Sequence, residues 1–145
     1  MTHPPASDWV LLVHAATTLF MTGVIWFVQI VHYPLFRDVG KSGFASYERQ
    51  HTRRTGQVLA LPMLAELASA VILVWRMGSS LAWCGLAVLI IIWVSTGLWQ
   101  VPAHRQLEDG FDVATHRRLV TTNWVRTMAW SARAVIALVL LAGAR

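Results

Sequence analysis

Four long apolar stretches, separated by polar segments, account for most of the chain. They cover residues 9–33, 58–75, 81–101 and 123–142. Each is close to the ~20 residues that a helix needs to cross the hydrocarbon core of a bilayer. The pattern predicts an all-α polytopic membrane protein with a single domain over residues 1–145. Its four transmembrane helices are expected to form a bundle and to cover residues 9–33, 44–76, 80–102 and 113–143.

Prolines and capping residues define the expected helix ends. Pro34 should end the first helix and Pro102 should interrupt the third, because the residue before a proline is pushed out of the helical region. Ser42 and Asp112 stand before the second and fourth helices and are residue types that cap helix N-termini. Pro62 lies inside the second helix, where its ring and its missing N–H predict a kink.

Composition and charge agree with a membrane protein. The chain is 56% hydrophobic and 13% charged, and its mean hydropathy is +0.52. The basic residues behind the net charge of +5 gather between the first two helices and between the last two. By the positive-inside rule both segments are cytoplasmic, so both termini face outward (N-out/C-out). This distribution accounts for the charge without nucleic acid as a partner, and the lipid bilayer is the expected partner.

Two further features refine this picture. Arginine predominates over lysine, which indicates a bacterial source and therefore the bacterial inner membrane. The single cysteine, Cys84, lies inside the third helix and rules out an intramolecular disulfide. We expect Cys84 to be a small residue of the core.

Two charged residues fall near the middle of the predicted spans. Arg133 lies ten residues into the last apolar stretch, about 15 Å along a helix. Glu66 lies at a similar depth in the second helix. Because a charge at mid-bilayer is costly unless it meets a partner or a wet cavity, Glu66 and Arg133 are predicted to pair across the bundle. Such a pair either fixes the helix register or contains a group that titrates during function.

Polar side chains also gather at the cytoplasmic ends of all four helices. They are Gln29, His32, His51, Arg54, Gln100, His104, Asn123 and Arg126. Three tryptophans that lie deeper than an interfacial belt are expected beside them, namely Trp26, Trp93 and Trp130. Polar groups from every helix above interior aromatic rings predict a substrate or cofactor pocket that opens on the cytoplasmic side.

The three histidines allow more than one chemistry. His32, His51 and His104 come from three helices and can offer three imidazoles to a Cu, Fe or Zn ion. Two of them can instead ligate a haem, or all three can act as acid–base groups with no cofactor. Arg126 and Arg54 are suited to hold an anionic or phenolate oxygen.

The remaining polar residues are assigned supporting or structural roles. Gln29, Gln100 and Asn123 are expected to orient the substrate or the ligands. His14, which is alone at its depth, is expected to be a hydrogen-bonded packing residue, and His116 a surface residue.

Three short motifs carry a resemblance to a known family: Pro102-Ala103-His104-x-x-Leu107, Asn123-Trp124-x-Arg126, and Tyr33-Pro34 at the end of the first helix. Together they resemble the small four-helix membrane proteins that include the anthrone oxygenases. The resemblance implies oxidation of a planar, lipophilic aromatic molecule. It also adds Tyr33 to the residues expected at the substrate.

These observations favour a small membrane oxidoreductase, oxygenase-like, that acts on a lipophilic aromatic or quinone-like substrate. Two alternatives remain open from sequence. One is a transporter that uses the Glu66–Arg133 pair and the Pro62 kink, and that forms a homo-oligomer because four helices make a thin wall for a pore. The other is a non-catalytic membrane subunit that docks through its arginines.

Overall fold

The computed structural model describes residues 8–143, which are helical almost throughout and contain no strand. Four helical stretches are long and apolar enough to cross a membrane, as predicted: Trp9–Asp38, Lys41–Met77, Ser80–Leu107 and Val113–Ala142. In chain order the elements are α1 (Asp8–Phe27), η1 (Val28–His32), η2 (Pro34–Asp38), α2 (Lys41–Met77), α3 (Ser80–Ser95), η3 (Thr96–Gln100), α4 (Val101–Leu107) and α5 (Val113–Ala142).

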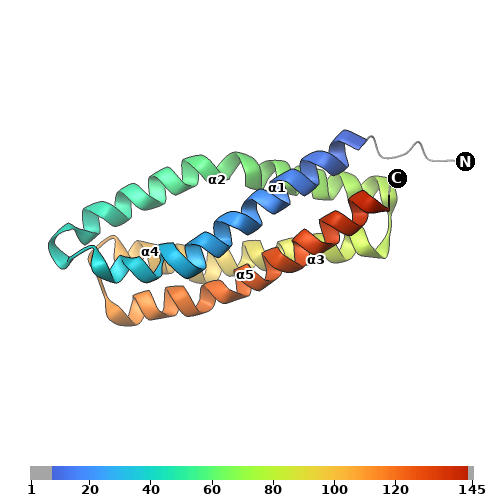
Figure 1. Ribbon diagram of the computed structural model, residues 1–145. Coiled ribbons are helices and arrows are strands. Elements are labelled where there is room, and N and C mark those ends of the chain that lie inside the picture. The colour runs from blue at the N-terminus through green and yellow to red at the C-terminus, as the bar shows by residue number, and fades with distance from the viewer. Residues whose placement is uncertain (1–7, 144–145) are drawn as a thin grey trace, which may run out of the picture.

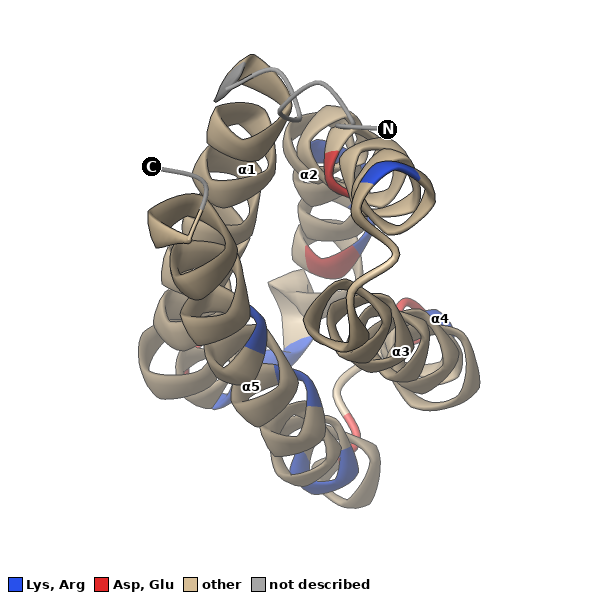
Figure 2. Cartoon of the chain, turned by 90° about the vertical axis from the view of Figure 1, so that its right-hand side faces the viewer, with Lys and Arg blue, Asp and Glu red and all other residues tan. Residues whose placement is uncertain are grey.

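The four long helices run antiparallel to their neighbours in one bundle (Figure 1). The connection from α1 to α2 and the connection from α4 to α5 lie together at one end, at the left of Figure 1. This end carries most of the basic residues and is called the basic end below. Seen along the bundle, α1 lies between α2 and α5, and α3 completes the ring beside α5 (Figure 2).

Two wide helical turns precede prolines at the basic end. The Tyr33 N–H bonds to the Val28 carbonyl just before Pro34, and the Val101 N–H bonds to the Thr96 carbonyl just before Pro102. Both bonds span five residues, which defines the π-helices η1 and η3. A proline ring clashes with the carbonyl four residues earlier, and a wider turn relieves this clash. The helical stretch continues into η2 at Pro34, so the predicted helix end there is wrong, whereas the predicted interruption at Pro102 is confirmed by the change from η3 to α4.

The predicted caps are correct at one helix and wrong at another. The Asp112 carboxylate accepts a hydrogen bond from the Thr115 N–H at 2.7 Å and caps α5 as predicted. The same backbone hydrogen bond lowers the pKa of this exposed carboxyl group. Ser42 does not cap α2, which begins earlier, at Lys41, after Gly40 with φ +84°. A glycine suits this position because L side chains disfavour positive φ.

The interior combines apolar clusters with buried polar groups, and the exterior is apolar. Trp130 and Leu89 belong to the central cluster, whereas Trp75 and Leu61 are 82% and 76% exposed. Large exposed apolar side chains along all four spans are what a lipid-facing surface requires. Cys84 belongs to this outer surface, so its predicted place in the core is wrong. The length and apolarity of α3 located Cys84 in a span, but not on a particular face of the helix.

Candidate functional site

A cavity of about 440 Å³ lies in the half of the bundle toward the basic end. Its walls come from α1, α2, η3 and α4, and Arg126 reaches it from α5. The exposed residues of its lining lie on α2, at Gly56 and Ala60, and on α4, at Val101 and Arg105. The opening therefore lies between α2 and α4, on the side of the bundle. Pockets for small molecules commonly measure roughly 300–1,000 Å³.

The cavity has an apolar part and a polar part. Met21, Ile25, Leu59 and Met63 line the part toward the bundle centre. The polar part lies toward the basic end and is lined by Tyr33, His51, Thr52, Thr55, Gln100, His104, Arg105, Glu108 and Arg126. This arrangement fits a molecule with an apolar body and a polar group at one end.

A chain of three side chains closes the polar part. The Glu48 carboxylate bonds to Nδ1 of His104, and Nε2 of His104 lies 2.8 Å from the Tyr33 hydroxyl oxygen. Glu48 is fully buried, and Tyr33 is 4% exposed. With Nδ1 donating to the Glu48 carboxylate, Nε2 is the nitrogen that accepts a hydrogen bond from the Tyr33 hydroxyl. The three side chains form a continuous hydrogen-bonded chain from the cavity lining to a buried carboxylate.

Glu48 was not among the predicted site residues. It comes three residues before His51 and four residues after Phe44, so all three lie on one face of α2. The signal in the sequence was that Glu48, a charged residue, shares a helix face with Phe44 and His51. The surrounding segment contains several other charged residues, so Glu48 did not stand out from them.

His32 and His51 form a second group beside this chain. Their nearest nitrogens lie 2.9 Å apart, and the Thr55 hydroxyl lies 3.1 Å from Nδ1 of His51. His51 lines the cavity and stands 5.4 Å from the His104 ring, centroid to centroid. His32 lies behind His51 and packs against Phe36. The three predicted histidines are therefore neighbours, as the convergence of the helix ends suggested.

The histidine arrangement differs from a three-histidine metal centre. Among residues 8–143, no group of three or more His, Cys, Asp or Glu residues is arranged to hold a metal ion. His32 and His51 bond to each other, and His104 bonds on both sides to Tyr33 and Glu48. A ligating imidazole must instead turn a free nitrogen toward the metal. The assignment of His32, His51 and His104 as metal ligands therefore stays a prediction from the sequence, and in this structure their nitrogens bond to one another, to Tyr33 and to Glu48.

Arg126 reaches the cavity within a buried amide network. Its Nη1 donates to Asn123 Oδ1 at 3.1 Å, and Asn123 Nδ2 donates to Gln29 Oε1 at 2.9 Å. Gln29 Nε2 in turn donates to the Val120 carbonyl. Arg126 also interacts electrostatically with the Tyr33 hydroxyl. Asn123 and Gln29 thus hold Arg126 in place, and they are not themselves part of the cavity lining.

The predicted tryptophan wall is not formed. Trp26 is 39% exposed and donates to Ser131 at 3.0 Å, Trp93 is 38% exposed, and Trp130 is fully buried in the central cluster. Aliphatic side chains and methionines line the cavity in their place. The rise per residue predicts only how far along a helix each ring lies, and the rotation of each helix about its axis directs these rings away from the cavity.

Two other residues also differ from their predictions. Arg54 is exposed on α2 and does not line the cavity. His116 is only partly exposed, and its Nε2 lies 2.7 Å from the Tyr33 carbonyl oxygen, so it is not a simple surface residue. This contact ties α5 to the end of η1, directly beside the Glu48–His104–Tyr33 chain. Gln100 lines the cavity as predicted and donates to the Thr122 hydroxyl at 3.0 Å.

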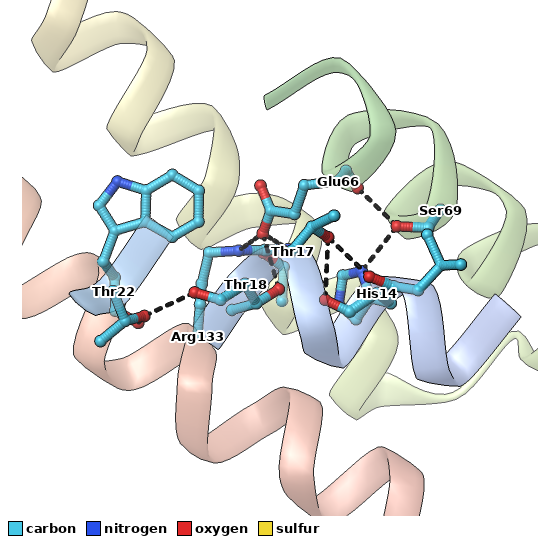
Figure 3. Close-up of polar contacts among 10 residues, drawn as sticks. His14, Thr17, Thr18, Thr22, Glu66, Ser69 and Arg133 are labelled. Atoms are coloured by element: carbon cyan, nitrogen blue, oxygen red, sulfur yellow. Dashed lines mark hydrogen bonds and ion pairs between the residues drawn. The ribbon is translucent and has the colours of Figure 1, made fainter. Parts of the chain in front are cut away.

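The predicted Glu66–Arg133 pair is confirmed (Figure 3). Nε of Arg133 lies 2.6 Å from Glu66 Oε1, and Nη1 of Arg133 donates to the Gly85 carbonyl. Thr18 donates to the same carboxylate oxygen at 3.1 Å. Glu66 and Arg133 are 0% and 1% exposed, and neither lines the cavity.

His14 continues the polar contacts around this pair (Figure 3). Its Nδ1 lies 3.0 Å from the Ser69 hydroxyl, which in turn donates to the Glu66 carbonyl. The predicted packing role of His14 is confirmed by this hydrogen bond and by its 3% exposure.

No protein-family model matches the chain, and no curated protein or solved structure matches it either. Function must therefore be argued from the site itself.

Proposed function

We propose that the protein is a small membrane oxidoreductase, oxygenase-like, that acts on a lipophilic aromatic molecule of the phenol or quinone kind. The observation that carries this proposal is the Glu48–His104–Tyr33 chain, which ends at the polar part of an apolar cavity. The combination provides a place for an apolar ring system and a route for one proton.

The bacterial inner membrane is the proposed location, with the basic end in the cytoplasm and both termini outside. The four long apolar helices and the gathering of arginines at one end support this orientation. The cavity then lies in the cytoplasmic half of the bilayer, and its opening between α2 and α4 faces lipid. A lipophilic substrate enters sideways from the membrane without passing through water.

The proton step follows from the hydrogen bonds. Tyr33 takes a proton from the substrate as its own phenolic proton passes to Nε2 of His104. The Glu48 carboxylate stabilises the imidazolium that forms and keeps its ring oriented. Enzymes use the same arrangement elsewhere: a carboxylate orients a histidine, and the histidine activates a nucleophile or a base. A positioned acid–base group contributes about 10²–10⁴-fold to a rate.

Proton removal prepares an aromatic ketone for oxidation. A CH₂ group opposite a carbonyl, in the central ring of a fused-ring aromatic ketone, loses one proton and becomes an electron-rich enolate that is conjugated through the aromatic rings. Dioxygen then oxidises this anion, so that the CH₂ group and O₂ become a second C=O group and one water. Tyr33, His104 and Glu48 carry out the proton transfer, and dioxygen is the oxidant.

The alternatives have less support. A transporter would need its Glu66–Arg133 pair to meet a path for cargo, but this pair is closed, almost inaccessible and separate from the cavity lining. A purely anchoring subunit would have no need of a buried carboxylate–imidazole–phenol chain beside a cavity. Both observations favour the oxidoreductase.

Oxygen uptake by the purified protein in detergent tests the proposal, with anthrone and a short-chain quinol as probe substrates. The wild type should consume oxygen and form the quinone, which is followed by its absorbance. Tyr33→Phe and His104→Gln should each lower kcat by about 10²-fold or more, because the proton acceptor or its activating base is lost.

Tyr47→Phe is the matched control. Tyr47 is the only other tyrosine of the chain, and it contacts Phe36 and His51 through its ring. This variant should retain full turnover. The proposal would be contradicted if the folded Tyr33→Phe and His104→Gln variants turned over at the wild-type rate. It would also be contradicted if the wild type bound the probes but consumed no oxygen.

A further inference from the structure

Arg126 is a buried cation with an unused donor. It is 7% exposed, it lines the cavity, and its Nε has no hydrogen-bond partner. Its Nη1 donates to the neutral Asn123 amide, and the Tyr33 hydroxyl lies near enough to interact with it electrostatically. A buried donor that lacks a partner in the protein normally receives one from water or a ligand.

The two arginines on the inner face of α5 differ in their counter-charge. Arg133 forms an ion pair with the Glu66 carboxylate. Arg126 lies seven residues earlier on the same face, yet within residues 8–143 no carboxylate forms an ion pair with it. The buried carboxylate of its own region, Glu48, is bonded to His104. A buried guanidinium without an opposite charge is costly, so the cavity has a strong preference for an anion.

The guanidinium is held firmly in this position. Asn123 fixes Nη1, Gln29 fixes Asn123, and the Val120 carbonyl fixes Gln29. This network joins η1 to α5, so the orientation of Arg126 does not depend on a ligand. Donors that are oriented in advance bind an anion without a further ordering cost.

We infer that the cavity binds a molecule with an apolar ring body and an anionic oxygen, a phenolate or enolate, and that Arg126 is the residue that holds this oxygen. The inference rests on the site of the proposed function and adds the charge state of its ligand. The apolar body lies against Met21, Ile25, Leu59 and Met63, and the oxygen lies beside Tyr33 and Arg126. An enolate formed by proton loss to Tyr33 is then stabilised where it forms.

A chromogenic nitronaphthol tests the inference without any turnover, because its phenol and phenolate forms have different visible spectra. Bound to the wild type, the probe should ionise at a pH about one unit or more below its value in empty detergent micelles, a tenfold preference for the anion. Arg126→Gln should abolish this shift, and Arg126→Lys should retain part of it, because it keeps the charge without the planar fork.

Arg118→Gln is the matched control, since Arg118 is an exposed arginine two turns earlier on α5 and outside the cavity lining. It should leave the probe's ionisation as in the wild type. If Arg126→Gln does not fold, Arg126→Lys and a neutral nitronaphthyl methyl ether still decide the question. Equal affinity of the wild type for the ether and the ionised naphthol would overturn the inference.

The oxidoreductase proposal and the anion-site inference can be contradicted independently of each other. A depressed probe ionisation without oxygen uptake would support the anion site and contradict the oxidoreductase. Oxygen uptake by the wild type with a probe ionisation that Arg126→Gln leaves unchanged would support the enzyme and overturn the anion site.

Discussion

At the scale of single residues, two arginines of α5 illustrate how burial and partner decide a role. Arg133 is neutralised by Glu66 and also bonds to the Gly85 carbonyl, so it links α5 to both α2 and α3. Arg126 lines a cavity, has an Nε without a hydrogen-bond partner and forms no ion pair within residues 8–143. The first arrangement is closed and structural, whereas the second is open to a ligand.

The Glu66–Arg133 pair should therefore matter for stability and not for turnover. Removing one partner leaves an uncompensated buried charge, so Arg133→Met or Glu66→Leu alone should lower the free energy of unfolding by about 3–5 kcal/mol. The double variant Glu66→Leu/Arg133→Met should recover most of this loss, because apolar residues of similar volume replace a buried pair at little net cost. Denaturant unfolding in detergent measures all three variants.

Turnover of the double variant separates the structural role from a transport role. An oxidoreductase whose site lies elsewhere should retain its kcat. A stable double variant that has lost all function would show that the pair acts directly, as the transporter alternative requires.

At the scale of elements, the two π-helices are the main departure from regular geometry. Each ends two residues before a proline, and each lies in a helical stretch that contributes to the site. The wide turns set the direction of the side chains around them, among which Gln29 supports Arg126 and Gln100 lines the cavity. Pro34 and Pro102 thus influence the orientation of side chains at the site through the wide turns before them, although neither proline lines the cavity.

The close approach of α3 to α5 depends on Gly85. A Cβ atom at this position would lie 3.3 Å from Cγ2 of Ile136 and 3.7 Å from Nη1 of Arg133. Gly85→Ala should be tolerated after small shifts, whereas Gly85→Leu should destabilise the bundle by about 1–3 kcal/mol through overpacking. Thermal unfolding in detergent measures the difference.

Gly23→Leu provides the comparison for this prediction. Gly23 lies in α1, and a Cβ atom there would meet nothing within 4 Å. Its leucine variant should be at least as stable as the wild type, since a glycine in a helix interior is itself unfavourable. Equal stability of the two leucine variants would show that α3 and α5 can separate freely at Gly85.

At the scale of the whole molecule, the bundle has apolar outer faces and a polar interior. The buried polar groups form two sets, one around Glu66 and Arg133 and one at the basic end around His104 and Arg126. Only the second set adjoins the cavity. The two polar sets therefore differ in their surroundings: one is enclosed among the helices, and the other adjoins the cavity in which we propose that a ligand binds.

Orientation in the membrane can be tested with single cysteines in a Cys84→Ser background. Ser80→Cys lies at the turn between α2 and α3, and Asp109→Cys lies in the connection before α5. A membrane-impermeant maleimide should label Ser80→Cys in intact spheroplasts and label Asp109→Cys only after lysis. The reverse pattern would place the basic end outside and contradict the proposed topology.

The sequence alone determined the properties that depend on position along one helix. Span length and hydropathy predicted four helices, and rise per residue placed Glu66 level with Arg133 and gathered the polar residues at one end. The Asp112 cap was equally predictable, because its partner is three residues away. These properties need no knowledge of how one helix is turned relative to another.

The tertiary structure decided which way each side chain points. Successive residues of an α-helix are rotated by about 100° around its axis. Each π-turn adds one residue to a helical turn, so the side chains beyond it are rotated away from the positions that a regular 3.6-residue pattern predicts. In the structure Trp26 and Trp93 face outward, and Glu48 instead completes the site through His104. The cavity itself arises from the spacing of α2 and α4, which depends on contacts among all the helices and is not encoded in the pattern of any single one.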